Sequence, residues 1–163
     1  MMRARVITWF ASPYLVLLFR WFLGAIFVYA GLVKIADPLG FALALYNYHI
    51  LPAWMINPLA ICLPWVEVII GAGLLAGIMI PGGALVVSGM LAIFAVVTGI
   101  SLIRGLDIAC GCFSTSAGAE PITWLYVVRD LILLGMGIHI LLFDQGYAAL
   151  ARFIQTQLSK IGN

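Results

Sequence analysis

Charged side chains are scarce in this sequence of 163 residues. Aspartate, glutamate, lysine and arginine together make up 9% of it, whereas hydrophobic residues make up 65%. Soluble globular domains carry about 25% charged residues, so the composition excludes an ordinary soluble domain. The mean hydropathy of +1.19 points the same way. We therefore predict an integral membrane protein with a single domain that covers residues 1–163.

Clusters of basic residues are absent as well. The eight lysine and arginine residues are scattered singly, and the net charge is only +2. Nucleic-acid binding needs basic side chains gathered on one face of a domain. We therefore expect membrane lipid around the protein and no nucleic-acid partner.

Cysteine is also rare, with three residues, and their odd number does not fit the disulfide framework of a small secreted protein. Cys110 and Cys112 flank Gly111 in a polar segment. Two cysteines at this spacing can bridge only through a small, bent ring, which the glycine permits. Strained disulfides are easily reduced, and labile disulfides are the catalytic or regulatory ones. We predict Cys110 and Cys112 as a reactive pair.

Other interpretations of the pair stay open. It could be a static bridge, although so small a loop constrains the unfolded chain very little. It could supply two thiolate ligands to a metal, although no second pair exists and His49 or Cys62 would have to join it. The two cysteines could also be unrelated and buried. Cys62 itself is interpreted as a small packing residue, with a third exchanging thiol as the alternative.

Four apolar runs are long enough to cross a membrane as helices, which takes about 20 residues each. They extend over residues 14–35, 58–80, 83–103 and 122–143. We predict an all-α fold, an antiparallel four-helix bundle in the membrane. The proline and two glycines of Met79–Gly83 favour a tight reversal between the second and third spans. Gly73 and Gly77 form a predicted small-residue face for close helix packing.

Two further segments suit the membrane surface. The stretch between the first two spans is of mixed polarity and predicts a short surface helix. Its aromatic residues at headgroup level are Tyr46, Tyr48 and Trp54. The tail at residues 145–161 places one apolar stripe at helical spacing and predicts an amphipathic helix. The stripe consists of Tyr147, Leu150, Ile154, Leu158 and Ile161.

Basic residues near the span ends predict the orientation of the bundle. One side carries Arg3, Arg5, Arg152 and Lys160, and the other side carries Lys34 and Arg104. This bias predicts both termini in the cytoplasm and the Cys-Gly-Cys segment outside. We expect the first span to be retained, because the short core of a cleaved signal would not contain a charge such as Arg20.

Charged residues also occur inside the predicted spans. Glu67 lies roughly 13 Å and Arg129 roughly 10 Å from the outer ends of their helices. An unpaired charge at such depth costs a few kcal/mol or more, so charges in spans pair or line a polar cavity. We predict a Glu67–Arg129 ion pair, with Arg20 or Asp130 nearby. The functional alternative is a pocket of Arg20, Glu67 and Arg129 that binds a quinone head group or a small sulfur anion.

Four motifs follow one another along the chain. They are "RWFLGAIFVYAGLVKIADPLGFA" from Arg20, "EVIIGAGLLAG" from Glu67, "CGCF" from Cys110 and "RD" at Arg129. Together they resemble the DoxX and MauE superfamily of small bacterial membrane proteins, and the "CGCF" motif is similar to its MauE-type branch. One departure is Ser114, where members of that branch often have glycine.

The resemblance implies a four-helix bundle in the bacterial inner membrane that takes part in thiol or sulfur redox chemistry. It also implies an extracytoplasmic thioredoxin-like partner. The positions that it carries over are Arg20, Glu67, Cys110, Cys112 and Arg129.

One hypothesis and one rival follow. In the hypothesis, Cys110 and Cys112 cycle between dithiol and disulfide as a thiol–disulfide oxidoreductase and exchange electrons with the thioredoxin-like partner. Quinone could be the electron acceptor or donor in the membrane, although no residue identifies it. In the rival, the two thiolates bind a soft metal ion or a small sulfur compound that the protein carries.

Overall fold

The structure is a computed structural model that describes residues 12–78, 80–106, 108 and 122–144. These residues form helices and no strand. The helices are α2 (Pro13–Ala36), α3 (Pro38–Asn47), α4 (Ala53–Ala76), α5 (Ile80–Ile103) and α6 (Trp124–Phe143). All but α3 are long and apolar enough to cross a membrane, which confirms the predicted all-α membrane bundle. The predicted tail helix at residues 145–161 lies outside the described residues.

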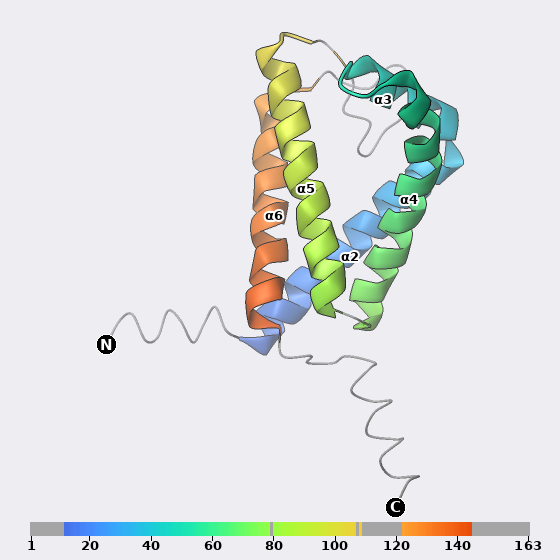
Figure 1. The fold of residues 1–163 in the computed structure, drawn as a ribbon. Coiled ribbons are helices and arrows are strands. Elements are labelled where there is room, and N and C mark those ends of the chain that lie inside the picture. Colours follow the sequence, from blue (N-terminus) through green and yellow to red (C-terminus); the bar gives the residue numbers. More distant parts are fainter. Residues whose placement is uncertain (1–11, 79, 107, 109–121, 145–163) are drawn as a thin grey trace, which may run out of the picture.

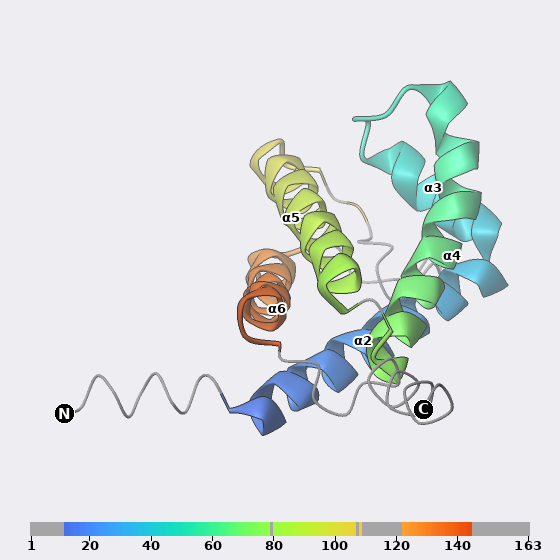
Figure 2. The ribbon, with the colours of Figure 1, turned by 60° about the horizontal axis from the view of Figure 1, so that its bottom comes forward.

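The four long helices form two pairs (Figure 1). α2 packs most closely against α4, and α5 packs most closely against α6. α2 runs obliquely across the bundle and also contacts α6, while α4 contacts α5 (Figure 2). We call the end of the bundle that carries α3 the α3 end. α4 and α6 begin there and α2 and α5 end there, whereas α2 begins and α6 ends at the opposite end.

Glycines let α2 and α4 approach closely. A Cβ atom at Gly24 would lie 2.8 Å from the carbonyl oxygen of Gly71, and one at Gly71 would lie 2.8 Å from that of Gly24. One at Gly31 would lie 2.7 Å from the carbonyl oxygen of Pro64. Because these neighbours are backbone atoms, the two helices can sit at this distance only without side chains between them.

The turn between α4 and α5 comes earlier than predicted. Gly77 ends α4 in the left-handed conformation, with a φ of 71°, and the Ile78 N–H donates to the Gly73 oxygen at 2.9 Å. Pro81 lies in the first turn of α5, where a helix has no partner for its N–H. The predicted face of Gly73 and Gly77 is wrong, since Gly77 is the cap and a Cβ at Gly73 would meet no atom closer than 3.6 Å.

α4 is displaced toward the N-terminus relative to the predicted second span. It begins at Ala53 rather than at residue 58, because it continues through Pro58 and Pro64. Each proline removes one hydrogen bond of the helix, a loss that helices in membranes tolerate when their neighbours satisfy the freed carbonyl. The predicted bounds of the other three spans agree with the structure to within three residues.

α3 is the predicted short helix between the first two spans. The Asp37 carboxylate caps it by accepting a hydrogen bond from the Gly40 N–H at 2.9 Å. Tyr46 and Trp54 are exposed, as headgroup residues would be, whereas Tyr48 is buried. Tyr48 therefore belongs to the interior rather than to the membrane surface.

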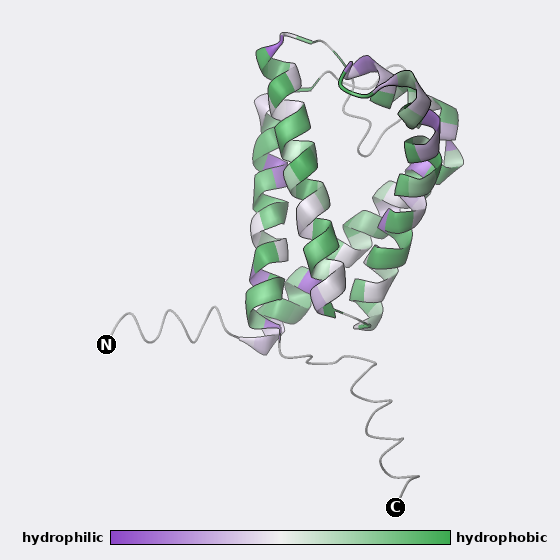
Figure 3. Cartoon of the chain, in the orientation of Figure 1, coloured by the Kyte–Doolittle hydropathy of each residue, from purple (hydrophilic) through white to green (hydrophobic). Residues whose placement is uncertain are grey.

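Hydrophobic residues predominate along the long helices (Figure 3). The core cluster includes Leu23, Leu74, Val87, Leu91 and Leu133. Many large apolar residues are exposed on the outer faces, among them Leu18, Trp21, Leu85, Leu125 and Leu131. Helices that are hydrophobic all round suit a lipid environment, so the structure is that of a multi-pass membrane protein.

Candidate functional site

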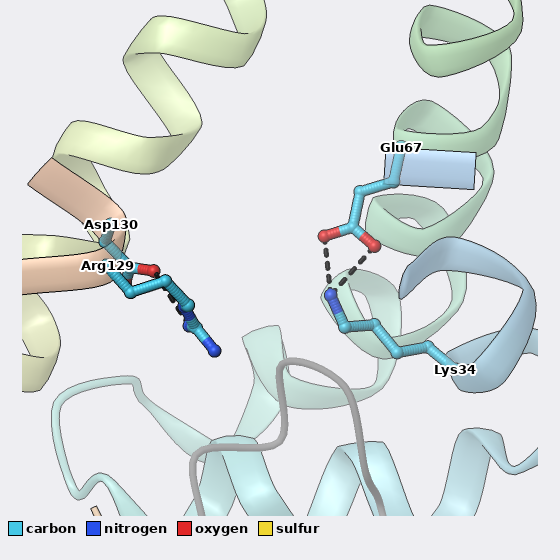
Figure 4. Close-up of polar contacts among 4 residues, drawn as sticks. All are labelled: Lys34, Glu67, Arg129 and Asp130. Atoms are coloured by element: carbon cyan, nitrogen blue, oxygen red, sulfur yellow. Dashed lines mark hydrogen bonds and ion pairs between the residues drawn. The ribbon is translucent and has the colours of Figure 1, made fainter. Parts of the chain in front are cut away.

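Two ion pairs face each other inside the bundle near the α3 end (Figure 4). In the first, Lys34 from the last turn of α2 meets Glu67 from the middle of α4. The Lys34 Nζ donates to both carboxylate oxygens of Glu67, at 2.6 and 2.8 Å. Each side chain is 2% exposed. The pair therefore joins α2 to α4 through a two-pronged, buried contact.

Aromatic rings complete the surroundings of Lys34. Its Nζ lies 5.0 Å from the ring centre of Phe41 in α3 and 5.5 Å from that of Phe94 in α5. Ring faces attract cations at such distances, more strongly where water is excluded. Four helices therefore contribute to holding one ammonium group in the interior.

The second pair lies within α6. The Arg129 guanidinium turns back toward its neighbour, and its Nε and Nη2 donate to Oδ1 of Asp130 at 3.0 and 2.8 Å. The Asp130 side chain is 3% exposed and that of Arg129 is 29% exposed. Arg129 also lies over the ring of Tyr126, at 5.0 Å. The carboxylate is thus the buried member of the pair, and the guanidinium is the partly exposed one.

A cavity of about 30 Å³ lies between the two pairs. Its walls comprise the charged residues Lys34, Glu67, Arg129 and Asp130 and the apolar residues Ile26, Phe27, Ala30, Leu91, Phe94 and Leu133. This volume holds about two water molecules.

The charges at the cavity balance, with two cations and two anions. Both Arg129 and Asp130 lie within electrostatic reach of Lys34. Tyr48, which follows α3, is buried close to Thr98, Asp130 and Arg129. Burial raises the pKa of Tyr48 above its ordinary value of 10.0, and the Thr98 hydroxyl acts in the opposite direction. Tyr48 therefore keeps its proton at neutral pH and can act as a hydrogen-bond donor.

The predicted Glu67–Arg129 ion pair is wrong, although both residues line the same cavity. Each has a nearer partner: Lys34 for Glu67 and Asp130 for Arg129. Neighbours on a helix point about 100° apart, but the long arginine side chain is flexible enough to reach back to Asp130.

Lys34 was not predicted as a site residue, because its place at the end of the first span suggested a surface charge. The helical spacing of the apolar residues in this span could have identified Lys34 as an interior residue. The buried face of α2 includes Val16, Arg20, Leu23, Phe27, Ala30 and Lys34. These residues recur every three or four positions, so Lys34 continues an interior stripe.

Arg20 is fully buried but does not line the cavity. It lies 14 residues before Lys34 on the same helix, which corresponds to about 21 Å. At the opposite end of the bundle it lies within electrostatic reach of Asp144. The structure thus brings Glu67 and Arg129 together and places the third predicted pocket residue, Arg20, elsewhere.

Cys110 and Cys112 lie outside the described residues, so their role stays a prediction. The chain on either side of them is described. The Ile122 N–H donates to the Ile108 oxygen at 2.8 Å, so the segment that carries the pair both leaves and rejoins the bundle at the α3 end. Cys62 is exposed on α4 and is therefore not a core packing residue. Among the described residues, no three His, Cys, Asp or Glu side chains gather as metal ligands.

Comparisons with known proteins point to one family. The family model described as methylamine utilisation protein MauE matches residues 12–143. The MauE protein of Paracoccus denitrificans is 31% identical over 79% of this chain and 69% of its own length. That of Methylorubrum extorquens is 29% identical over 74% of this chain and 64% of its own length, just under two thirds. No solved structure matches the chain.

Proposed function

The chain belongs to the family of methylamine utilisation protein MauE, and from this premise we propose that it is a membrane-embedded thiol–disulfide exchange protein. Cys110 and Cys112 are the reactive residues, and the partner is an extracytoplasmic protein of the thioredoxin-like class. The observation that carries the proposal is the Cys-Gly-Cys pair, set in a polar segment of an otherwise apolar membrane bundle. The wider grouping with DoxX proteins stays a prediction from the motifs.

The exchange proceeds in two balanced steps. A thiolate of the pair attacks a disulfide of the partner, so that a mixed disulfide forms, the partner's S–S bond breaks, and the departing partner thiolate takes up a proton. The second cysteine then loses its proton and attacks the mixed disulfide. The chain ends as a disulfide, and the partner ends as a dithiol that has gained two electrons. The reverse sequence moves the same electrons the other way.

The position of the segment supports access by a soluble partner. Ile108 and Ile122, which flank it, lie at the α3 end of the bundle. Exposed Trp54 lies at that end too, where an aromatic residue suits the membrane surface. Thiol exchange requires cysteines that a partner can reach from the aqueous phase, and both described flanks of the segment lie at an end of the bundle.

The test is the capture of a mixed disulfide. With Cys112→Ser, the first step can occur but the resolving cysteine is missing, so the mixed disulfide accumulates; Cys110→Ser tests the opposite assignment. We expect one of these variants, but not Cys62→Ser, to carry a partner attached through a reducible bond, identified by mass spectrometry. The absence of any trapped partner in both variants, where a known exchanger traps its own, contradicts the proposal.

The rival proposal, in which the thiolates carry a soft metal ion, predicts a different result in the same cells. Alkylation of Cys110 and Cys112 with a mass tag would then be blocked by stoichiometric metal and unchanged by reductant. Exchange instead predicts a mixture of tagged and untagged protein that shifts toward tagged protein on reduction.

A further inference from the structure

One oxygen atom in the two ion pairs is left without a partner. Both carboxylate oxygens of Glu67 accept hydrogen bonds from Lys34, and Oδ1 of Asp130 accepts two from Arg129. Oδ2 of Asp130 has no hydrogen-bond partner among the described residues, and it is buried from solvent. The Asp130 side chain is 3% exposed and lines the cavity.

A carboxylate oxygen in this position requires a partner. Burying a polar atom without a hydrogen bond is unfavourable, and a charged atom more so. The adjoining cavity of about 30 Å³ has room for water, and its charged walls offer water the polar contacts that it needs. Water in the cavity, or a proton on Oδ2, satisfies the atom.

The groups around Asp130 restrict the alternatives. α2 contributes Lys34 and α4 contributes Glu67, and these two are engaged with each other. Tyr48, after α3, and Thr98, in α5, are uncharged neighbours at neutral pH. Arg129 in α6 binds the other oxygen, Oδ1. No second cation among the described residues contacts Oδ2, so a proton can be added there without displacing a hydrogen bond of the carboxylate.

The cavity is separated from buried Arg20 along α2. Leu23 of the core cluster lies on that helix between Arg20 and the cavity residue Phe27. On the α3 side, Arg129 is partly exposed, and α6 begins at Trp124, about 8 Å away along the helix axis. The α3 end is therefore the nearer source of protons.

We propose that this cavity is a hydrated proton-binding site, in which Asp130 takes up a proton on Oδ2 from water and returns it to the same side of the membrane. The ligand is the proton, and the step is the transfer of one proton from hydronium to the carboxylate, which gives a carboxylic acid and water. Protonation removes the negative charge that Asp130 presents to Arg129. The site is distinct from the cysteine pair and does not rest on the thiol exchange proposed above.

Infrared difference spectroscopy of the full chain in lipid nanodiscs tests the proposal. We expect acidification to produce the C=O band of a protonated carboxylic acid, which shifts in D₂O because cavity water exchanges with the bulk. Aspartate labelled with ¹³C at the side-chain carboxyl should shift the band, whereas labelled glutamate should not. The labelling needs no mutation and assigns the signal to the aspartates.

Variants then assign the band to one residue. Asp130→Asn should remove from the aspartate signal the component that Asp130 contributes, and Asp37→Asn should retain that component, since asparagine can still cap α3. Should Asp130→Asn not fold, as judged by circular dichroism and gel filtration, Asp130→Glu should move the band to the frequency of a glutamic acid. A double variant with Cys110→Ser and Cys112→Ser should keep the band, so that failure of the thiol proposal leaves this one standing. An aspartate signal that is absent at every pH tested, is undiminished in Asp130→Asn, or does not shift in D₂O overturns the proposal.

Discussion

The contact between Lys34 and Glu67 shows how single residues can carry opposite charges into a membrane interior. Taking either charge out of water alone is costly, and their mutual attraction offsets that cost only with good geometry. Here the ammonium group reaches both carboxylate oxygens and lies near two aromatic rings. The two residues should therefore be energetically coupled, each tolerable only in the presence of the other.

The coupling predicts an asymmetry between single and double substitutions. Lys34→Met leaves the Glu67 carboxylate buried without its partner and should reduce the free energy of unfolding by about 3–5 kcal/mol. The double substitution Lys34→Met with Glu67→Met removes both charges and should recover most of that loss. Thermal unfolding in detergent measures both variants, and a double variant no more stable than Lys34→Met would contradict the coupling.

The close approach of α2 and α4 depends on glycines, which have no side chain. Gly24, Gly31 and Gly71 face backbone of the other helix at distances where a methyl group cannot fit. The ion pair of Lys34 and Glu67 joins the same two helices. Close backbone approach and a buried charge pair thus act on one interface, and changes that separate the helices should also disturb the ion pair.

Two glycine substitutions test this interface. Gly71→Ala adds a methyl group 2.8 Å from the Gly24 oxygen and 2.9 Å from the Val28 nitrogen, so it should destabilise the protein by about 1–3 kcal/mol through overpacking. Gly89→Ala in α5 is the matched control, because nothing lies within 4 Å of its added carbon. It should be neutral, or stabilising by up to about 1 kcal/mol through helix propensity. Comparable losses in the two variants, measured by thermal unfolding, would rule out a special role for close packing of α2 and α4.

The molecule as a whole has two distinct ends. One carries α3, the start of α6 and both ends of the cysteine-bearing segment, and the other carries the start of α2 and the end of α6. Lys34 does not act as a surface charge, since it is buried in an ion pair. When Lys34 is left out of the count of basic residues near the span ends, only Arg104 remains on the α3 side. The charge bias that favours cytoplasmic termini is then stronger.

This orientation predicts which positions a membrane-impermeant thiol reagent reaches. In a chain whose own cysteines are replaced by serine, Trp54→Cys, which is exposed at the α3 end, should be labelled in intact spheroplasts. Asp144→Cys, at the opposite end, should be labelled only after the membrane is permeabilised. The reverse pattern would place the α3 end, and the cysteine pair with it, in the cytoplasm.

Much of the fold could be predicted from local properties of the chain. Hydrophobicity accumulates residue by residue, so the four spans and the surface helix before α4 follow from composition within a window. The bounds of α4 did not follow, because a proline signals a break in water but is tolerated inside a helix whose neighbours satisfy its freed carbonyl. The four motifs also pointed to the MauE family, whose model covers the residues of all four.

The partner of Glu67 came from packing between helices distant in the sequence. The depth of Glu67 did not follow, because α4 begins at Ala53 and Glu67 therefore lies about 21 Å from its start rather than roughly 13 Å. Its pairing depends on how each helix is rotated and tilted against the others. That rotation brought Lys34 to Glu67 and left Oδ2 of Asp130 facing a cavity. Close contacts such as that of Gly24 with Gly71 decide which side chains a helix turns toward its neighbour. Such contacts join residues far apart in the sequence, so a hydropathy average over a short window cannot predict them.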